Sequence, residues 1–127
     1  MGQAGREGAM VSAHYVPDAG HLVKLSFDPQ TGHEQAGWRP AIVLSPASYN
    51  RKSGLAVVAP ITNQGKGYPF EVPLRKGLKI TGFVLADALR NIDWQARKAR
   101  FEGNAPDDVL FAVRERVALL LGLPRPE

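Results

Sequence analysis

One short segment gathers the side chains best suited to chemistry. Residues 32–40 read Gly-His-Glu-Gln-Ala-Gly-Trp-Arg-Pro, and an apolar run follows at 41–44. The imidazole of His33 can accept or release a proton near neutral pH, and the planar guanidinium of Arg39 can bind two oxygens of an anionic group. This set suits proton transfer at an anionic substrate. It is equally compatible with a surface loop in which Arg39 pairs with Glu34, since polar loops of this kind are common.

The neighbours of Arg39 predict where it lies in the fold. Pro40 is tolerated at the start of a strand and holds the residue before it in an extended conformation. The apolar run 41–44 has the length of a buried strand, and the Gly-containing segment 29–37 is typical of a loop. We therefore expect Arg39 at a strand edge beside a loop, where a substrate can reach it.

Short strands separated by turn signals account for most of the remaining chain. The patterns predict strands over 22–27, 55–61 (with a bulge or an end at Pro60), 70–75 and 95–101, an apolar segment over 80–89 and a break at 91–94. Ser45 is expected to cap a short helix that begins at Pro46 and ends at Gly54. An amphipathic helix is expected from about 104 to Gly122. Together, these strands and helices indicate a mainly β fold with a C-terminal helix, built as a bent sheet or small barrel.

Composition limits the kind of protein. The 127 residues include no cysteine, which excludes disulfides and thiolate metal sites, and no apolar run has the roughly 20 residues needed to span a bilayer. The formal charge of +4 suits a polyanionic partner such as nucleic acid or an acidic peptide. Residues 1–9 lack the apolar core of a signal peptide. We expect them to be a disordered extension before a single domain over 10–127.

Several motifs, in this order and spacing, resemble the MazF/PemK family of bacterial toxin–antitoxin endoribonucleases. The resemblance covers nearly all of residues 15–121 and rests on Tyr-Val-Pro-Asp-Ala-Gly at 15–20, Phe-Asp-Pro at 27–29, the segment 32–40, Val-Leu-Ser-Pro at 43–46, Tyr-Asn at 49–50, Pro-Ile-Thr at 60–62, Lys-Gly-Tyr-Pro-Phe-Glu-Val at 66–72 and Leu-Ala-Asp at 85–87. It implies an SH3-like β-barrel, a homodimer in the bacterial cytoplasm, and an mRNA interferase that cleaves single-stranded RNA without a metal or other cofactor. It also implies an acidic, MazE-like antitoxin that covers the RNA-binding groove.

In such a reaction the 2′-hydroxyl of the RNA attacks the adjacent phosphate, leaving a 2′,3′-cyclic phosphate and a 5′-hydroxyl. The protein must take a proton from the 2′ oxygen, return one to the 5′ oxygen and stabilise the added charge at phosphorus. The resemblance makes Arg39 a catalytic residue and gives Thr62 the task of orienting a phosphate oxygen or the nucleophile by hydrogen bonding. Thr62 could also satisfy the Gly-rich turn after it, and both roles can hold at once.

The roles of His33 and Asp87 stay open. Some PemK-like members use a His here with an Asp and an Arg from the segment 85–87. Asp87 matches that Asp, but Leu85 stands where the Arg would be, so the sequence fits an Arg39/Thr62 site better. Asp87 is then either catalytic, together with His33, or a buried structural carboxylate.

Six polar residues flank these groups on the same two loops. They could contact RNA through base edges, stacking or phosphate, or could form a hydrated rim: Glu34, Gln35, Asn63, Gln64, Lys66 and Tyr68. Two other functions suit the same fold. A CcdB-like toxin binds DNA gyrase without catalysis and depends on its last residues, whereas residues 121–127 here contain no aromatic anchor. The second alternative is an inactive relative retained to bind the antitoxin.

Overall fold

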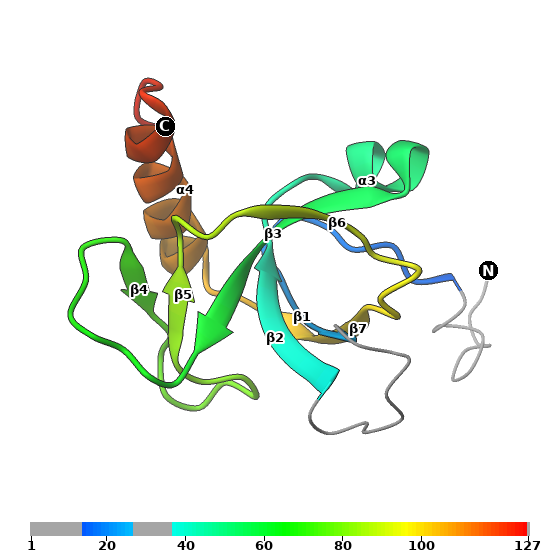
Figure 1. Ribbon diagram of the computed structural model, residues 1–127, viewed down its shortest axis with the longest axis horizontal. Helices are drawn as coiled ribbons and strands as arrows, with labels where there is room; N and C mark the ends of the chain where they lie inside the picture. The colour runs from blue at the N-terminus through cyan, green and yellow to red at the C-terminus, as the bar shows by residue number, and fades with distance from the viewer. Residues whose placement is uncertain (1–13, 27–36, 127) are drawn as a thin grey trace.

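The computed structural model describes residues 14–26 and 37–126, and Figure 1 shows how their elements are arranged. The strands are β1 (His21–Ser26), β2 (Trp38–Val43), β3 (Leu55–Thr62), β4 (Glu71–Pro73), β5 (Phe83–Leu85), β6 (Arg90–Asp93) and β7 (Arg100–Asn104). The helices are α3 (Ala47–Ser53) and α4 (Asp107–Leu121). The predicted mainly β fold with a C-terminal helix is therefore confirmed. The extension expected at residues 1–9 lies outside the described residues.

The strands form one strongly bent antiparallel sheet. Its order is β4-β5-β3-β2-β1-β7, and β6 pairs with β3 away from this path. The long strand β3 makes this possible, because its first half pairs with β6 while its last two residues pair with β5. Within the described part of the chain the path is open between β4 and β7, and the bent sheet has the barrel-like form that was expected.

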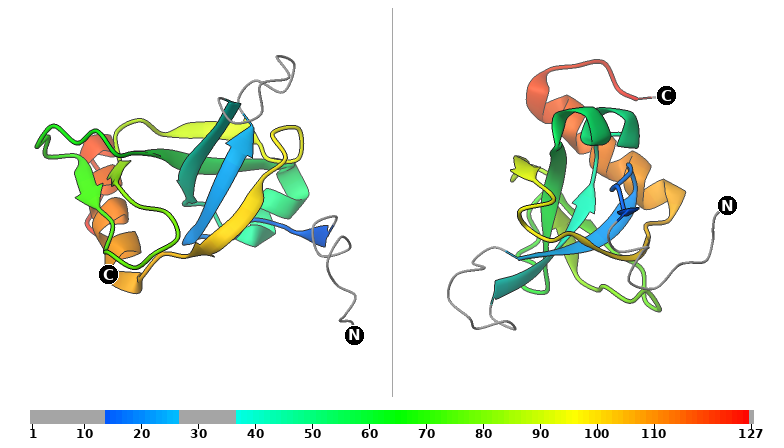
Figure 2. Two further views of the ribbon diagram at one scale, coloured as in Figure 1. Left: turned by 90° about the horizontal axis from the view of Figure 1, so that it is seen from below. Right: turned by 90° about the vertical axis from the view of Figure 1, so that its right-hand side faces the viewer.

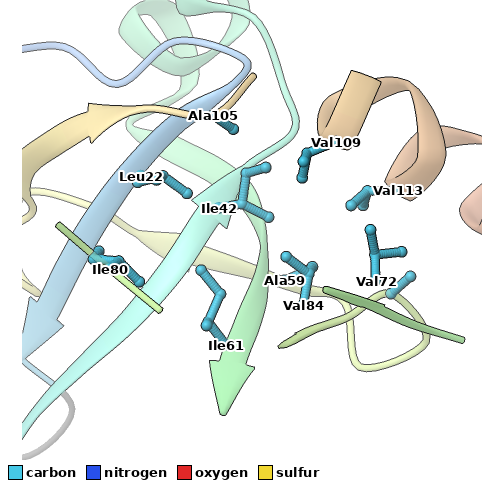
Figure 3. Packing of buried hydrophobic residues seen from close by; sticks show 11 residues of the cluster. Leu22, Ile42, Ala59, Ile61, Val72, Ile80, Val84, Ala105, Val109 and Val113 are labelled. Carbon is cyan, nitrogen blue, oxygen red and sulfur yellow. The ribbon is translucent and has the colours of Figure 1, made fainter. Parts of the chain in front are cut away.

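Side chains on the two faces of the sheet build two separate cores. One core joins the sheet to α4 and contains Leu22, Ile42, Ala59, Ile61, Val72, Val84, Val109 and Val113 (Figure 3). The other contains Val23, Leu25, Ala41, Val43, Ala56, Val58, Ile92 and Trp94. Successive residues of a strand point to opposite faces. The alternation along β2 and β3 therefore places Arg39 and Thr62 on the face turned away from α4, which covers one side only (Figure 2).

The amphipathic C-terminal helix is confirmed. Helix α4 carries Asp107 and Asp108 in its first turn, where carboxylates suit the positive end of the helix dipole. It ends at Gly122, whose φ of 70° is the left-handed conformation typical of a helix C-terminus. Val109 and Val113 are buried against the sheet.

Two predictions about local structure are wrong. Residues 91–94 were expected to be a break, but Arg90–Asp93 form β6, in which Ile92 is buried opposite Ala56 of β3. Residues 95–99 were expected to be strand but form turns, and pairing with β1 begins only at Arg100. The cause is Asp93, whose side chain accepts the N–H of Ala96 and whose backbone carbonyl accepts the N–H of Arg97.

The expected cap at Ser45 is also wrong. The N-cap residue of α3 is Pro46, and no side chain caps this helix. The hydroxyl of Ser45 instead donates to Oδ1 of the fully buried Asn50, 2.6 Å away, and accepts the N–H of Val57. The amide of Asn50 also donates to the carbonyl of Pro17. This buried network ties the N-terminal segment, α3 and β3 together.

Candidate active site

Arg39 lies where the sequence placed it. It is the second residue of β2, its side chain is exposed, and it stands opposite Leu25 of β1. No carboxylate in residues 14–26 or 37–126 forms an ion pair with its guanidinium. The alternative partner, Glu34, lies outside the described residues, as do His33 and Gln35. A substrate anion can therefore approach Arg39 from the side that the described residues leave open.

The sheet register brings Arg39 and Thr62 to the same end of neighbouring strands. Ala41 of β2 pairs with Pro60 of β3, and the next residues on this face are Arg39 and Thr62. Beyond Ala41 and Pro60 the strands separate (Figure 1), and Thr62 pairs with Phe83 of β5 instead. The two predicted catalytic groups thus share a face and flank the opening between β2 and β3.

A pocket of about 650 Å³ opens beside Thr62 and is called here the Thr62 pocket. The ends of β3 and β5 and the loop 63–70 between β3 and β4 form its walls. Five of the predicted site residues line it: Thr62, Gln64, Lys66, Tyr68 and Asp87. Arg39 and Asn63 are outside its lining, and Oδ1 of Asn63 accepts a hydrogen bond from the hydroxyl of Thr81 at 3.1 Å.

Asp87 is not the buried structural carboxylate that the sequence allowed. It is exposed, two residues after β5, and it accepts a hydrogen bond from the hydroxyl of Tyr68. This hydrogen bond and the charge of Asp87 hold the pKa of the Tyr68 hydroxyl above its ordinary value. The ring of Tyr68 is half exposed, so its face is available for stacking beside the pocket.

Glu71 shapes the loop, and the sequence reasoning missed it. It is the first residue of β4, its side chain is buried, and its carboxylate accepts the backbone N–H groups of Lys66 (3.0 and 3.1 Å) and Gly67 (3.1 Å). These donors would otherwise have no partner in the strand ladder. A Glu directly after a Gly-rich loop, at a position that alternates with Val72, was the signal that could have identified it.

Two glycines permit the close approaches around Thr62. Gly82 has a φ of 119°, and a Cβ there would lie 2.3 Å from the backbone oxygen of Thr62. A Cβ on Gly65 would lie 2.5 Å from the ring of Phe83.

The hydroxyl oxygen of Thr62 accepts the N–H of Gln64 at 3.1 Å, as the turn interpretation predicted. Its hydrogen is then available to donate to a substrate oxygen.

The site therefore combines a guanidinium, a hydroxyl donor and a pocket with one ammonium, one phenol and carboxylates. Among the described residues no three His, Cys, Asp or Glu side chains are grouped so that they could hold a metal ion. In the same residues no helix is long and apolar enough to cross a membrane. What the arrangement offers is charge stabilisation by Arg39, hydrogen bonding by Thr62 and stacking by Tyr68.

Comparison with known sequences finds a family and named relatives. The model of the family described as "PemK-like, MazF-like toxin of type II toxin-antitoxin system" matches residues 18–121. The endoribonuclease toxin MazF of Escherichia coli (strain K12) is 47% identical over 113 residues, which are 89% of this chain and 100% of that protein. The endoribonuclease PemK of Escherichia coli is 35% identical over 108 residues, 82% of this chain and 81% of that protein.

Comparison with solved structures agrees. MazF in a MazE–MazF crystal structure from Deinococcus radiodurans has 50% identity and a TM-score of 0.78, covering 87% of this chain and 99% of that one. MazF from the same organism without MazE has 56% identity and a TM-score of 0.77, covering 86% and 99%. A mycobacterial endoribonuclease solved with its cognate antitoxin has 22% identity and a TM-score of 0.69 over 87% and 99% of the chains, a likeness of fold alone.

Proposed function

Because this chain belongs to the family of PemK-like, MazF-like toxins of type II toxin–antitoxin systems, we propose that it is a sequence-specific endoribonuclease that cleaves single-stranded RNA without a metal. One structural observation supports this most directly. Arg39 and Thr62 share a face at the same end of neighbouring strands, next to a pocket large enough for an unpaired base.

The proposed reaction is attack of the RNA's own 2′ oxygen on the adjacent phosphorus. A bond forms between O2′ and phosphorus, the bond from phosphorus to O5′ breaks, and the products are a 2′,3′-cyclic phosphate and a 5′-hydroxyl. Arg39 neutralises the charge that develops on the non-bridging oxygens, and Thr62 donates a hydrogen bond to one of them. The 2′ proton goes to His33 or to Asp87, and the remaining group or water protonates O5′.

Substrate binding is assigned to the rim of the Thr62 pocket. Lys66 meets a phosphate, the ring of Tyr68 stacks on an unpaired base, and the amide of Gln64 reads a base edge. Glu34, Gln35 and Asn63 extend this surface in the proposal. A base can enter only when it is free of a partner strand, which explains a requirement for single-stranded RNA.

The partners follow from the family and from charge. The relatives include a MazF solved with MazE, and the present chain carries a formal charge of +4. We therefore assign this chain an acidic, MazE-like antitoxin that occupies the RNA-binding face, a homodimeric state and a place in the bacterial cytoplasm.

The experiment compares two RNAs in the presence of EDTA. The full chain should cleave a long single-stranded RNA at defined sites and leave 5′-hydroxyl ends. A matched RNA carrying a 2′-deoxy nucleotide on the 5′ side of the mapped site should not be cut there, because the nucleophile is missing. Cleavage of the deoxy substrate would overturn the mechanism. Absence of any cleavage, together with inhibition of DNA gyrase supercoiling, would favour the CcdB-like alternative.

A further inference from the structure

A second pocket lies away from the Thr62 pocket and is called here the Trp38 pocket. Its volume is about 460 Å³. The residues that line it include Tyr15, Trp38, Trp94, Gln95, Lys98 and Arg100. Three of these are aromatic and two are cationic, and none of the described residues in its lining is acidic. The proposed cleavage chemistry uses none of them.

The aromatic walls of this pocket are held in place. The indole of Trp94 is buried, and its Nε1 donates to the carbonyl of Asn50 at 2.9 Å. The hydroxyl of Tyr15 donates to Nδ1 of His21 at 2.8 Å. These two rings are therefore fixed before a ligand enters the pocket, so little conformational entropy of their side chains is lost on binding.

The cations are also positioned by the fold. The guanidinium carbon of Arg100 lies 4.2 Å from the ring centre of Trp38, and its Nε lies 3.9 Å from the carboxylate of Glu102. Lys98 has a φ of 53° and is the one non-glycine residue with positive φ in the part of the chain that the structure describes. Such a conformation persists only where the surroundings enforce it, here a turn closed by the N–H of Lys98 on the carbonyl of Gln95.

The strand order places β2, which carries Arg39, beside both pockets. The Thr62 pocket is built on β3 and β5, and the Trp38 pocket extends from Trp38, the residue before Arg39 in β2, to Arg100 of β7. Crossing from β5 through β3 to β2 takes roughly 10 Å at the usual strand spacing, and continuing through β1 to β7 takes roughly 19 Å in all. That span is comparable to a run of several nucleotides, and single-strand binding surfaces of other folds hold about 4–16.

We propose that the Trp38 pocket binds an unpaired base and its phosphate from the same RNA strand, on the far side of the cleavage point from the Thr62 pocket. This inference rests on the proposed endoribonuclease function. Trp38 accepts any base on the ring face that the Arg100 guanidinium leaves uncovered, so the pocket adds affinity with little sequence preference, while Lys98 and Arg100 contact phosphate. Flat aromatic walls beside cations suit a nucleotide better than an acidic peptide, which would use the charges and leave the ring faces unpaired.

The test measures binding of non-cleavable 2′-O-methyl RNA by fluorescence anisotropy. Two probes contain the same mapped cleavage sequence, one of about 4 nucleotides and one of about 12. The variant Lys98→Asn, Arg100→Gln removes both charges, and Asn tolerates the left-handed backbone at position 98. A second variant, Trp38→Leu, removes the stacking face and keeps an apolar side chain. The control, Lys52→Gln, Lys76→Gln, removes two charges that line neither pocket.

We expect the loss of RNA affinity to depend on the length of the RNA probe. In both test variants, the affinity for the long probe should fall at least about 10-fold more than the affinity for the short probe. For the double variant, the slope of log K against log salt concentration, measured with the long probe, should become shallower by roughly 0.7 per charge removed. The control should show no length-dependent loss of affinity. Equal losses with both probes, or none, would overturn the proposal. The proposal would also be overturned if the variants lost binding of an acidic peptide but still bound the long RNA with unchanged affinity. Cleavage by the unaltered protein tests the proposed function separately.

Discussion

The hydroxyl of Tyr68 donates a hydrogen bond to the carboxylate of Asp87 and so joins the β3–β4 loop to the segment that follows β5. Both residues line the Thr62 pocket. The ionised carboxylate favours the protonated phenol, and this is why the pKa of Tyr68 is raised. RNA entering the pocket must either bind this pair as one polar unit or separate its members.

Replacing Asp87 should release the phenol. In Asp87→Asn the carboxylate charge is gone, so the pKa of Tyr68 should fall toward the ordinary value of about 10. Ultraviolet titration of phenolate, compared with Tyr68→Phe to isolate the contribution of this ring, measures the shift. An unchanged Tyr68 titration would show that the two side chains do not interact in solution.

Removing the guanidinium at position 39 should abolish most catalysis without unfolding the protein. Loss of one preorganised charge-stabilising group typically costs about 10²–10³ in kcat. Because Arg39 is exposed, the free energy of unfolding of Arg39→Ala should stay within about 0.5 kcal/mol of the unaltered protein. Single-turnover cleavage and chemical denaturation provide the two measurements, with Lys52→Ala as a charge-loss control. Retained single-turnover rates would remove Arg39 from the mechanism.

A methyl group at position 82 should disturb Thr62. In Gly82→Ala the new Cβ would meet the backbone oxygen of Thr62 at 2.3 Å, at a φ that alanine rarely adopts. We expect destabilisation of more than about 1 kcal/mol and slower cleavage. Gly77→Ala is the matched control, because Gly77 also has positive φ but nothing lies within 4 Å of its Cβ. Similar cleavage rates in the two variants would argue against a requirement for this close approach.

The carboxylate of Glu71 should be needed as an acceptor and not only as a filler of space. In Glu71→Gln one oxygen is replaced by an amide that turns a donor toward the backbone N–H groups of Lys66 and Gly67. The loss of these acceptors should cost about 1–3 kcal/mol of stability and weaken RNA binding. Denaturation and binding of a non-cleavable RNA report both effects, with Glu115→Gln on α4 as control. Unchanged RNA affinity would show that the loop keeps its path without Glu71.

Stability should fall in mild acid because of His21. Its Nδ1 accepts from Tyr15 and from the N–H of Asp18, and its ring packs edge-on against Phe101. Burial lowers the pKa of His21, while the charge of Asp18 opposes this shift. The unfolded chain therefore binds a proton first, and this part of the stability, present above about pH 6.5, is lost as the pH falls through the folded-state pKa.

The variant His21→Gln should show a smaller loss of stability below about pH 6.5 than the unaltered protein. Denaturant titrations at a series of pH values measure this slope. His33→Gln serves as the comparison, since it also removes one imidazole. If both variants show the same slope as the unaltered protein, His21 is not the group that titrates.

Hydrophobic alternation was enough to predict most of the sheet, because β1, β2 and β3 each bury side chains toward one or both cores. It failed at β6, where only Ile92 of four residues is buried and the polar neighbours resemble a turn. The prediction of a strand over 95–99 also failed. The sequence of this segment, Gln-Ala-Arg-Lys-Ala, holds no β-branched or aromatic residue to favour a strand, and hydrogen bonds to Asp93 fold it into turns.

The site was predictable where a residue's chemistry and its strand position coincide. Pro40 predicted the place of Arg39 at the start of β2, whereas Thr62 was identified by the resemblance to the MazF/PemK family. The contribution of Glu71 depends on three-dimensional packing, because its carboxylate reaches back over the loop to the backbone of Lys66 and Gly67. Likewise the Tyr68–Asp87 bond joins two loops that no local pattern relates.

Glu71 accepts its hydrogen bonds from the main chain of its loop and does not engage the side chains of Gln64, Lys66 or Tyr68. In the proposed function, substitutions at Gln64, Lys66 or Tyr68 therefore alter what the loop binds while the path of its main chain stays the same. On this proposal, a single exchange in the loop is enough to change the RNA sequence that this toxin cleaves, without any change in its fold.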